Sequence, residues 1–304
     1  MIQVLLKAVS FVLCMALAYL LKHSHVLRED DHRVVSTIVT NVTLPCAIIS
    51  SFQNFNLDLS LFFFLLLPIV SNSILIFLAW FTARNKSSEV KVYQLTNFSN
   101  YNIGSFTLPF IQNFLSPTCV VAACLYDTPN AFFTMGGTYT LASRFKEECP
   151  TFTFLGFFKR IMSSVTIKAY TVLLILTVLH IHIPQAVFTL VAPAANANAF
   201  MSMFMLGLYL DFDFQRETLL KIAKPLSIRL VVGTVLSFLI FRFVPLSLEL
   251  KRTAMLVLFA PFASLNPLYT EKIGSDYKTS AMCNSIGIVV SMILFSAMLT
   301  VWNA

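Results

Sequence analysis

Amides and one carboxylic acid stand out in a chain whose other residues are mainly apolar. The stretch N-I-G-S-F-T-L-P contains Asn102, Gly104 and Pro109, and Y-D-T-P-N contains Asp127 and Asn130. An amide both donates and accepts hydrogen bonds, whereas a carboxylic acid carries a proton or holds a cation. Burying an amide without a partner costs roughly 1–3 kcal/mol, so these side chains must bond either to a neighbouring helix or to a solute. The pattern predicts solute binding, with Asp127 as the candidate for ion coupling.

A matching set of polar and helix-breaking residues lies in the later part of the chain. Asn196 and Asn198 follow Pro193, and Asn266 follows Pro261. Proline removes a backbone N–H and clashes with the carbonyl one turn earlier, so it bends or breaks a helix. Freed carbonyls cannot face lipid, and they are tolerated only where protein or a watery cavity covers them. These residues are therefore further candidates for a binding site.

Motifs for bond-making chemistry are absent from the sequence. The chain has no G-x-S-x-G, no H-E-x-x-H and no phosphate-binding loop. Its six cysteines form no C-x-x-C pair, and its five histidines form no ligand set. A free cysteine inside an apolar segment behaves as a small apolar residue. We expect no enzyme activity, no disulfide, no metal and no cofactor beyond a coupling H⁺ or Na⁺.

The elements that hold these residues are predicted to be membrane-spanning helices. Of 304 residues, 57% are hydrophobic and 12% are charged, and the mean hydropathy is +0.79. Soluble domains carry about 25% charged residues. The apolar residues form ten blocks of about 18–25 residues, the length that crosses a hydrocarbon layer roughly 30 Å thick. The blocks are 2–21, 34–52, 59–81, 92–114, 117–142, 164–182, 184–210, 223–243, 254–269 and 279–302. This is typical of an all-α polytopic membrane protein, with the fourth, seventh and ninth helices interrupted by Pro, Gly or Asn.

The cations cluster in alternate loops. They are Lys22, Arg28 and Arg33; Arg84, Lys86 and Lys91; Arg144, Lys146, Lys159, Arg160 and Lys168; Arg216, Lys221, Lys224 and Arg229; and Lys272 and Lys278. Loops rich in Lys and Arg face the cytoplasm, so both termini are expected outside, in a plasma-membrane protein. The net charge of +7 then reflects topology and gives no case for nucleic-acid binding.

Ten spans with both ends outside divide into two halves of five, and an odd number per half requires the second half to be inverted. The halves are 1–142 and 164–304, joined by the linker 143–163, in which 151–162 is expected to form an interfacial helix. Pro45 corresponds to Pro193 and Pro109 to Pro261, each about half a chain apart. Secondary transporters built from inverted repeats bind their solutes where discontinuous helices meet near the midplane.

The stretch N-I-G-S-F-T-L-P resembles the N-T-G-F-x-G-L-P signature of the fourth helix of the auxin efflux carrier family, with Thr107 in place of the usual Gly. That family includes plant auxin exporters and bacterial malate-permease-like proteins. T-L-P-C-A-I-I-S-S-F, M-F-M-L-G-L-Y-L and A-P-F-A-S-L-N-P-L-Y look like its second, seventh and ninth helices.

The resemblance implies ten helices in two inverted five-helix repeats, with the fourth and ninth broken and crossing at their prolines. It also implies an anion site at the crossing, aided by Asn102, Asn130 and polar groups of the second and seventh helices. The partial positive charge of half-helix N-termini would hold a carboxylate there, and no arginine is evident within the membrane.

The expected function is secondary transport of a small organic anion by alternating access, with Asp127 as the candidate for proton coupling. The expected partners are that anion and membrane lipid, with a homodimer left open. A sodium-coupled carrier of the bile-acid-symporter type is the closest alternative, because amide oxygens also bind Na⁺. An intramembrane enzyme and a passive channel are the remaining alternatives.

Overall fold

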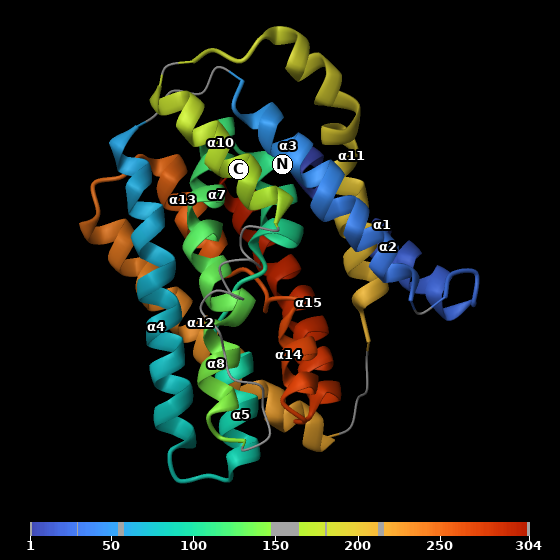
Figure 1. Cartoon of the computed structure of the whole chain (residues 1–304), viewed down its shortest axis with the longest axis vertical. Coiled ribbons are helices and arrows are strands. Elements are labelled where there is room, and N and C mark those ends of the chain that lie inside the picture. Colours follow the sequence, from blue (N-terminus) through green and yellow to red (C-terminus); the bar gives the residue numbers. More distant parts are fainter. Residues whose placement is uncertain are drawn as a thin grey trace.

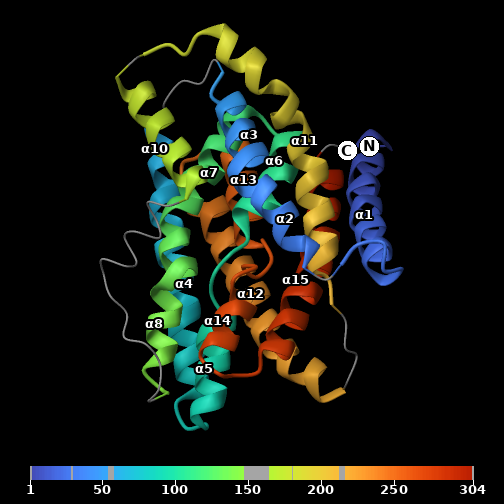
Figure 2. The ribbon, with the colours of Figure 1, turned by 45° about the vertical axis from the view of Figure 1, so that its right-hand side comes forward.

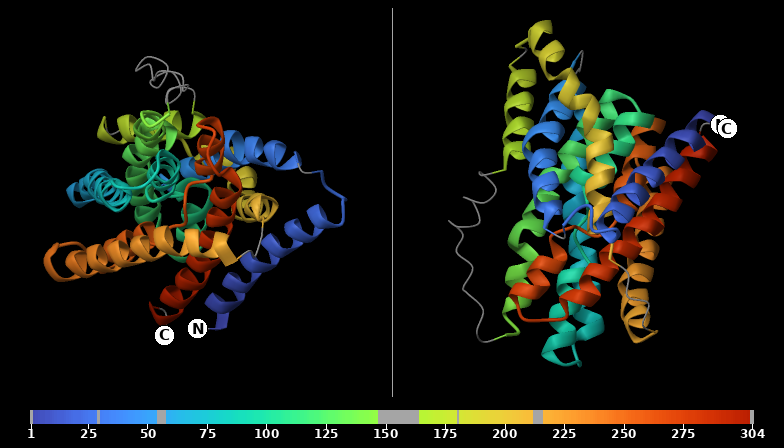
Figure 3. Two further views of the ribbon diagram at one scale, coloured as in Figure 1. Left: turned by 90° about the horizontal axis from the view of Figure 1, so that it is seen from below. Right: turned by 90° about the vertical axis from the view of Figure 1, so that its right-hand side faces the viewer.

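Helices make up the secondary structure of this computed structural model, which describes residues 2–28, 30–53, 58–146, 164–179, 181–211 and 216–302 (Figures 1 and 2). The expected interfacial helix at 151–162 lies outside the described residues. Both termini lie side by side at one end of the molecule (Figure 3). The all-α fold class predicted from the apolar blocks is confirmed for the described residues.

Six helices are long and apolar enough to cross a membrane, judged by length and composition. They are α1 (Ile2–His23), the segment Asp31–Ser51, the segment Leu59–Ala83, α11 (Gln185–Tyr209), α12 (Arg216–Phe243) and α15 (Tyr277–Trp302). The second segment joins α2 (Asp31–Ile38) to α3 (Leu44–Ser51), and the third joins η2 (Leu59–Phe62) to α4 (Phe63–Ala83). Many of their large apolar side chains are exposed, as expected for surfaces that contact lipid.

The remaining helical blocks are segmented or short. The fourth consists of α5 (Ser88–Asn97), a π-helical turn η3 (Ile103–Thr107) and α6 (Leu108–Phe114). The ninth consists of α13 (Leu248–Leu258) and α14 (Asn266–Lys272), so both expected interruptions are present. The fifth runs through α7 (Pro117–Phe132), a π-helical turn η4 (Phe133–Gly137) and α8 (Thr138–Ser143), and the sixth is α10 (Val165–Val178).

The sequence also predicted an interruption of the seventh helix at Pro193, and this prediction is wrong. Helix α11 runs continuously from Gln185 to Tyr209 through Pro193. One proline removes a single backbone N–H, and in α11 the turns on either side keep theirs. Pro45 behaves differently, because it is the second residue of α3 and directly follows a π-helical turn η1 (Val39–Thr43). The second helix is therefore irregular at its proline, whereas the seventh is not.

The helices form two packing groups. Helix α11 packs against α1, α2 and α3, and α10 packs against α3. Helix α4 packs against α5, α7 and α12, and α13 packs against α12 and α7. Figure 1 shows α1, α2 and α11 of the first group on the right and α4, α12 and α13 of the second on the left, with α10 above α7. The break between α5 and η3 and the break between α13 and α14 meet inside this assembly.

Candidate functional site: the crossing of two broken helices

The two breaks meet through main-chain contacts. The amide of Asn102 donates a hydrogen bond of 2.9 Å to the carbonyl of Pro261. Beside it, Tyr101 and Phe262 form an isolated antiparallel bridge. Asn100 has a φ of 71°, a left-handed conformation that asparagine adopts more readily than most residues. Pro261 lies beyond the end of α13 at Leu258, so its carbonyl accepts from the other break instead of from a following turn. The two breaks therefore cross, at Pro261 in the second as predicted but at Asn102 rather than Pro109 in the first.

A buried arginine donates hydrogen bonds to backbone carbonyls at both breaks. Arg229 on α12 is 5% exposed, and its Nη1 donates to the carbonyls of Asn100 at 2.8 Å and Phe98 at 3.3 Å. Its Nη2 donates to the carbonyls of Ala260 at 2.8 Å and Pro261 at 3.4 Å. Arginine presents several donors in a rigid fork, and this geometry suits two pairs of acceptors. Arg229 thereby caps the ends of α5 and α13 together.

Aromatic rings from both breaks enclose the guanidinium. Its central carbon lies 4.2 Å from the ring centroid of Tyr101 and 4.6 Å from that of Phe262. Such cation–π contacts are strongest where water is excluded. Grouping Arg229 with the loop cations was wrong, as was the expectation that no arginine lies within the membrane. Its position inside the apolar block 223–243 was the signal that could have identified it.

Asparagine side chains hold the first break in place. Asn130 on α7 accepts from the amide of Tyr101 at 3.2 Å and donates to its carbonyl at 2.8 Å, as a paired strand would. Asn72 on α4 accepts from the amide of Asn100 at 2.8 Å. The side-chain amide of Asn100 donates to Thr138 at 3.0 Å and to Asn266 at 3.2 Å. These amides replace the hydrogen bonds that an unbroken helix would supply.

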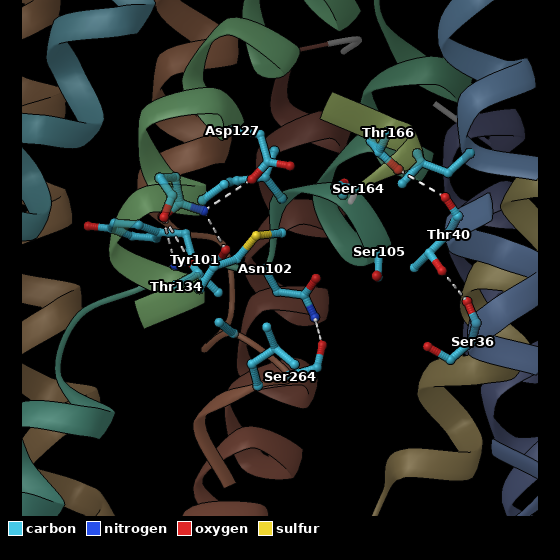
Figure 4. Close-up of a pocket in the computed structure, with 18 of the residues that line it drawn as sticks. Ser36, Thr40, Tyr101, Asn102, Ser105, Asp127, Thr134, Ser164, Thr166 and Ser264 are labelled. Carbon is cyan, nitrogen blue, oxygen red and sulfur yellow. Dashed lines mark hydrogen bonds between the residues drawn. The ribbon is translucent and has the colours of Figure 1, made fainter. Parts of the chain in front are cut away.

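A cavity of about 540 Å³ lies against the crossing. Its walls include Asn102, Ser105, Asp127 and Ser264, and Figure 4 shows these side chains opposite Ser36 and Thr40 of the second helix. The side-chain amide of Asn102 donates to the hydroxyl of Ser264 at 2.9 Å, so the two breaks are joined at the cavity wall.

Asp127 is the one acidic side chain among the residues that line this cavity. Its Oδ1 accepts from Asn130 at 3.1 Å. Gly104 lies next to it, because a Cβ there would be 3.5 Å from Oδ2 of Asp127 and 3.3 Å from a methyl group of Leu44. Lys272, which is exposed, adds a cation to the lining from the end of α14. The cavity therefore combines amides and hydroxyls with one acid and one base.

The structure brings only some of the predicted site residues to this cavity. Asn102, Gly104, Asp127 and Asn130 line it, whereas Pro109, Asn196, Asn198, Pro261 and Asn266 do not. Pro109 is the buried second residue of α6, and Pro261 lies at the crossing on the side of Arg229. Asn266 accepts from Asn100, and Asn196 lines a different cavity.

Sequence reasoning missed several hydroxyl groups in the lining, namely those of Ser36, Thr40, Ser105, Thr134, Ser164 and Thr166. Serine and threonine are common in membrane helices, where they usually bond their own backbone, so single residues gave no signal. Among the residues that the structure describes, no group of three or more His, Cys, Asp or Glu side chains gathers where a metal ion would bind.

Comparison with known proteins adds one match. The model of a family described as membrane transport protein matches residues 4–149. This range contains the first break, Asn102, Gly104 and the α7 residues Asp127 and Asn130. No curated protein matches the chain.

Proposed function

Because the chain belongs to the membrane transport protein family, which is that of the auxin efflux carriers, we propose that it is a secondary active transporter of a small organic anion. The substrate is a carboxylate such as malate or an auxin-like acid, bound in the crossing cavity and moved by alternating access. The observation that carries this proposal is the hydrogen bond between Asn102 and Ser264, which places polar groups of both breaks on one cavity wall.

The lining of the cavity supports an anionic solute. The amide of Asn102 and the hydroxyls of Ser105 and Ser264 are donors that a carboxylate accepts from. Lys272 places a positive charge in the same lining. Behind the crossing, the guanidinium of Arg229 donates to backbone carbonyls, and no described carboxylate forms an ion pair with it. Apolar side chains such as Leu44, which also lines the cavity, accommodate the carbon skeleton of the solute.

Proton coupling is the form of energy coupling that we propose. An ionised Asp127 repels a second carboxylate in the same cavity, since like charges at short range raise each other's free energy. Protonation of Asp127 removes this repulsion, so the proton and the anion bind together. Sodium coupling is the alternative, in which Asp127 and amide oxygens hold Na⁺.

We also propose the full topology of ten spans in two inverted halves, 1–142 and 164–304, with both termini outside the cell. The support is that six long helices and four segmented or short blocks follow one another in the predicted order. Each half contains one broken helix, α5–α6 or α13–α14, and the two breaks pair with each other.

A thermal-shift screen of the purified protein against carboxylates tests the proposed function. A specific ligand stabilises the folded state by mass action, so a carboxylate that binds raises the melting temperature, and a tighter one raises it further at equal concentration. Asn102→Ala removes the donor that faces the cavity and is expected to abolish the shift. Asn113→Ala is the matched control, since the side chain of Asn113 donates to the carbonyl of Pro109 in its own helix and does not line the crossing cavity. Equal shifts in all three proteins would refute the site.

Uptake into proteoliposomes distinguishes the coupling ions. An inward pH gradient is expected to drive accumulation of the carboxylate identified in the screen, and a Na⁺ gradient without a pH gradient is not. Accumulation driven by Na⁺ alone would favour the sodium-coupled alternative.

A further inference from the structure

A second cavity lies apart from the crossing cavity. It has a volume of about 290 Å³ and is lined by residues of α3, α6, α7 and α11, among them Ala47, Gln112, Asn113 and Asn196. The two cavities share no lining residue. The lining of the second cavity includes residues of the second half of α3 and the start of α7, and Figures 1 and 2 show α3 toward the end of the molecule that holds both termini.

Three chain segments line both cavities in turn. On α3, Leu44 faces the crossing cavity and Ala47 the second cavity. In the segment η3–α6, Ser105 lines the crossing cavity and Gln112 lines the second cavity. On α11, Met205 lines the crossing cavity. Residues 195, 196 and 199 of α11 line the second cavity. The stretch of each segment between these positions therefore separates one cavity from the other.

A polar cluster centred on Asn198 lies in this separating layer. The hydroxyl of Thr43 donates to Oδ1 of Asn198 at 3.1 Å, and Nδ2 of Asn198 donates to Oε1 of Gln112 at 3.1 Å. Ser202, one turn further along α11, adds a longer bond of 3.4 Å to Oδ1. Asn198 is fully buried and Thr43 is 4% exposed. The cluster ties η1 and α11 of one packing group to α6, which follows the break.

We propose that Asn198 is the gate residue that closes the route from the crossing cavity to the second cavity. The hydrogen bond from Asn198 to Gln112 breaks when the transporter opens the crossing to the side that the termini face. This gate presupposes the transport function proposed above.

The chemistry of the cluster suits a contact that opens and closes. Hydrogen bonds between side chains of membrane helices are individually weak, so a moving helix breaks them at small cost. In the open state, the amides of Asn198 and Gln112 face the water of the second cavity and exchange their mutual bond for bonds to water. An apolar pair at the same place would instead expose apolar surface to water on opening.

Chemical labelling tests this gate without any substrate. Ser105 is changed to Cys in a chain whose native cysteines have been replaced, and the rate of reaction with a membrane-impermeant maleimide is measured from the side of the termini. Asn196→Cys reports the rate at the second cavity itself. We expect the thiol at position 105 to react at least about tenfold more slowly than that at 196.

Adding Asn198→Ala is expected to speed labelling at position 105 by about fivefold or more. Thr43→Val removes one bond of the cluster with little change of shape, and it is expected to act in the same direction. This variant also keeps the test valid if Asn198→Ala fails to assemble. Asn113→Ala is the matched control, because Asn113 lines the second cavity without bridging two elements.

Three results would overturn the proposal. They are equal rates at positions 105 and 196 in the otherwise unchanged chain, no acceleration by either Asn198→Ala or Thr43→Val, and equal acceleration by Asn113→Ala. If the labelling test refutes the gate, the rise in melting temperature that a carboxylate causes by binding at Asn102 is unaffected. Failure of that shift leaves the labelling rates unaffected, so the two proposals fail separately.

Discussion

Arg229 on α12 donates a hydrogen bond of 2.8 Å to the backbone carbonyl of Asn100, the residue of positive φ that lies three positions after the end of α5. The same guanidinium donates at 2.8 Å to the carbonyl of Ala260 at the second break. One side chain therefore satisfies acceptors from two segments that are about half a chain apart. An arginine in this place allows two helices to be broken next to each other without leaving their carbonyls unpaired.

Arg229→Met is expected to lower the free energy of unfolding by about 2–4 kcal/mol, because it leaves buried carbonyls without a donor. Arg229→Lys is expected to restore part of the loss, since lysine keeps the charge but lacks the fork. Thermal unfolding in detergent measures both. Arg242→Met is the control, because Arg242 is an exposed cation on the same helix. Equal losses of unfolding free energy in the two methionine variants would mean that the hydrogen bonds of Arg229 at the crossing contribute little to stability.

Gly104→Ala is expected to weaken carboxylate binding more than it weakens folding. The added Cβ meets the end of the flexible Leu44 side chain at 3.3 Å and the carboxylate of Asp127 at 3.5 Å, so overpacking costs only about 1 kcal/mol. The wall of the cavity nevertheless shifts at the binding site. Thermal shifts with and without ligand separate the two effects.

Gly233→Ala serves as the comparison for Gly104→Ala. A Cβ at Gly233 would lie 3.2 Å from the carbonyl oxygen of Leu258, away from the residues that line the crossing cavity. It should reduce stability and leave the ligand-induced shift unchanged. A loss of ligand response in both variants would argue against a local effect at Gly104.

Asp127→Asn is expected to keep carboxylate binding and to abolish accumulation driven by a pH gradient. Asparagine has nearly the same shape but carries no titrating proton, so it mimics the neutral acid. Uptake into proteoliposomes at several external pH values measures the change. Asp58→Asn, at the exposed start of η2, is the control acid. Unchanged pH dependence in the Asp127 variant would remove it from the coupling mechanism.

Asp276 caps α15 and is expected to stabilise the protein above about pH 4. Partial burial alone would raise the pKa of its carboxyl, but hydrogen bonds from Thr279 and the contact with Lys221 outweigh this, so the pKa lies below its ordinary value. A folded-state pKa below the unfolded one gives stability that is fully present above the unfolded pKa and lost as the pH falls through the folded one.

Asp276→Ala is therefore expected to lower the free energy of unfolding by about 1 kcal/mol near pH 7, the usual cost of a lost N-cap. The difference from the unchanged chain should shrink below about pH 4. Asp276→Asn retains a capping side chain but not the charge, so its deficit near pH 7 should be smaller than that of Asp276→Ala and should also shrink below about pH 4. Melting temperatures across this pH range provide the measurement. A deficit of Asp276→Ala that stayed constant down to pH 3 would contradict the role of the ionised carboxylate.

Local sequence was enough to predict both helix breaks at the crossing. Asn102, Gly104 and Pro109 lie within eight residues, and Pro261 follows an apolar run, so each stretch favours a break whatever surrounds it. Pro193 misled the prediction, because a proline specifies a lost hydrogen bond but not whether the helix continues beyond it. The neighbouring turns of α11 decided that.

The sequence by itself determined the apolar helical blocks, the breaks in the fourth and ninth of them and the resemblance to auxin efflux carriers, because each depends on residues close together in the chain. Only the tertiary structure decided what the polar residues do. Asn102 faces a cavity, Asn198 lies in the layer between two cavities, and Arg229 lies at the crossing rather than in a loop. Asn198 and Gln112 form a hydrogen bond although they are 86 positions apart in the sequence, and Arg229 and Asn100 do so although they are 129 apart. Helical periodicity relates only residues a few positions apart, so it could not predict these contacts.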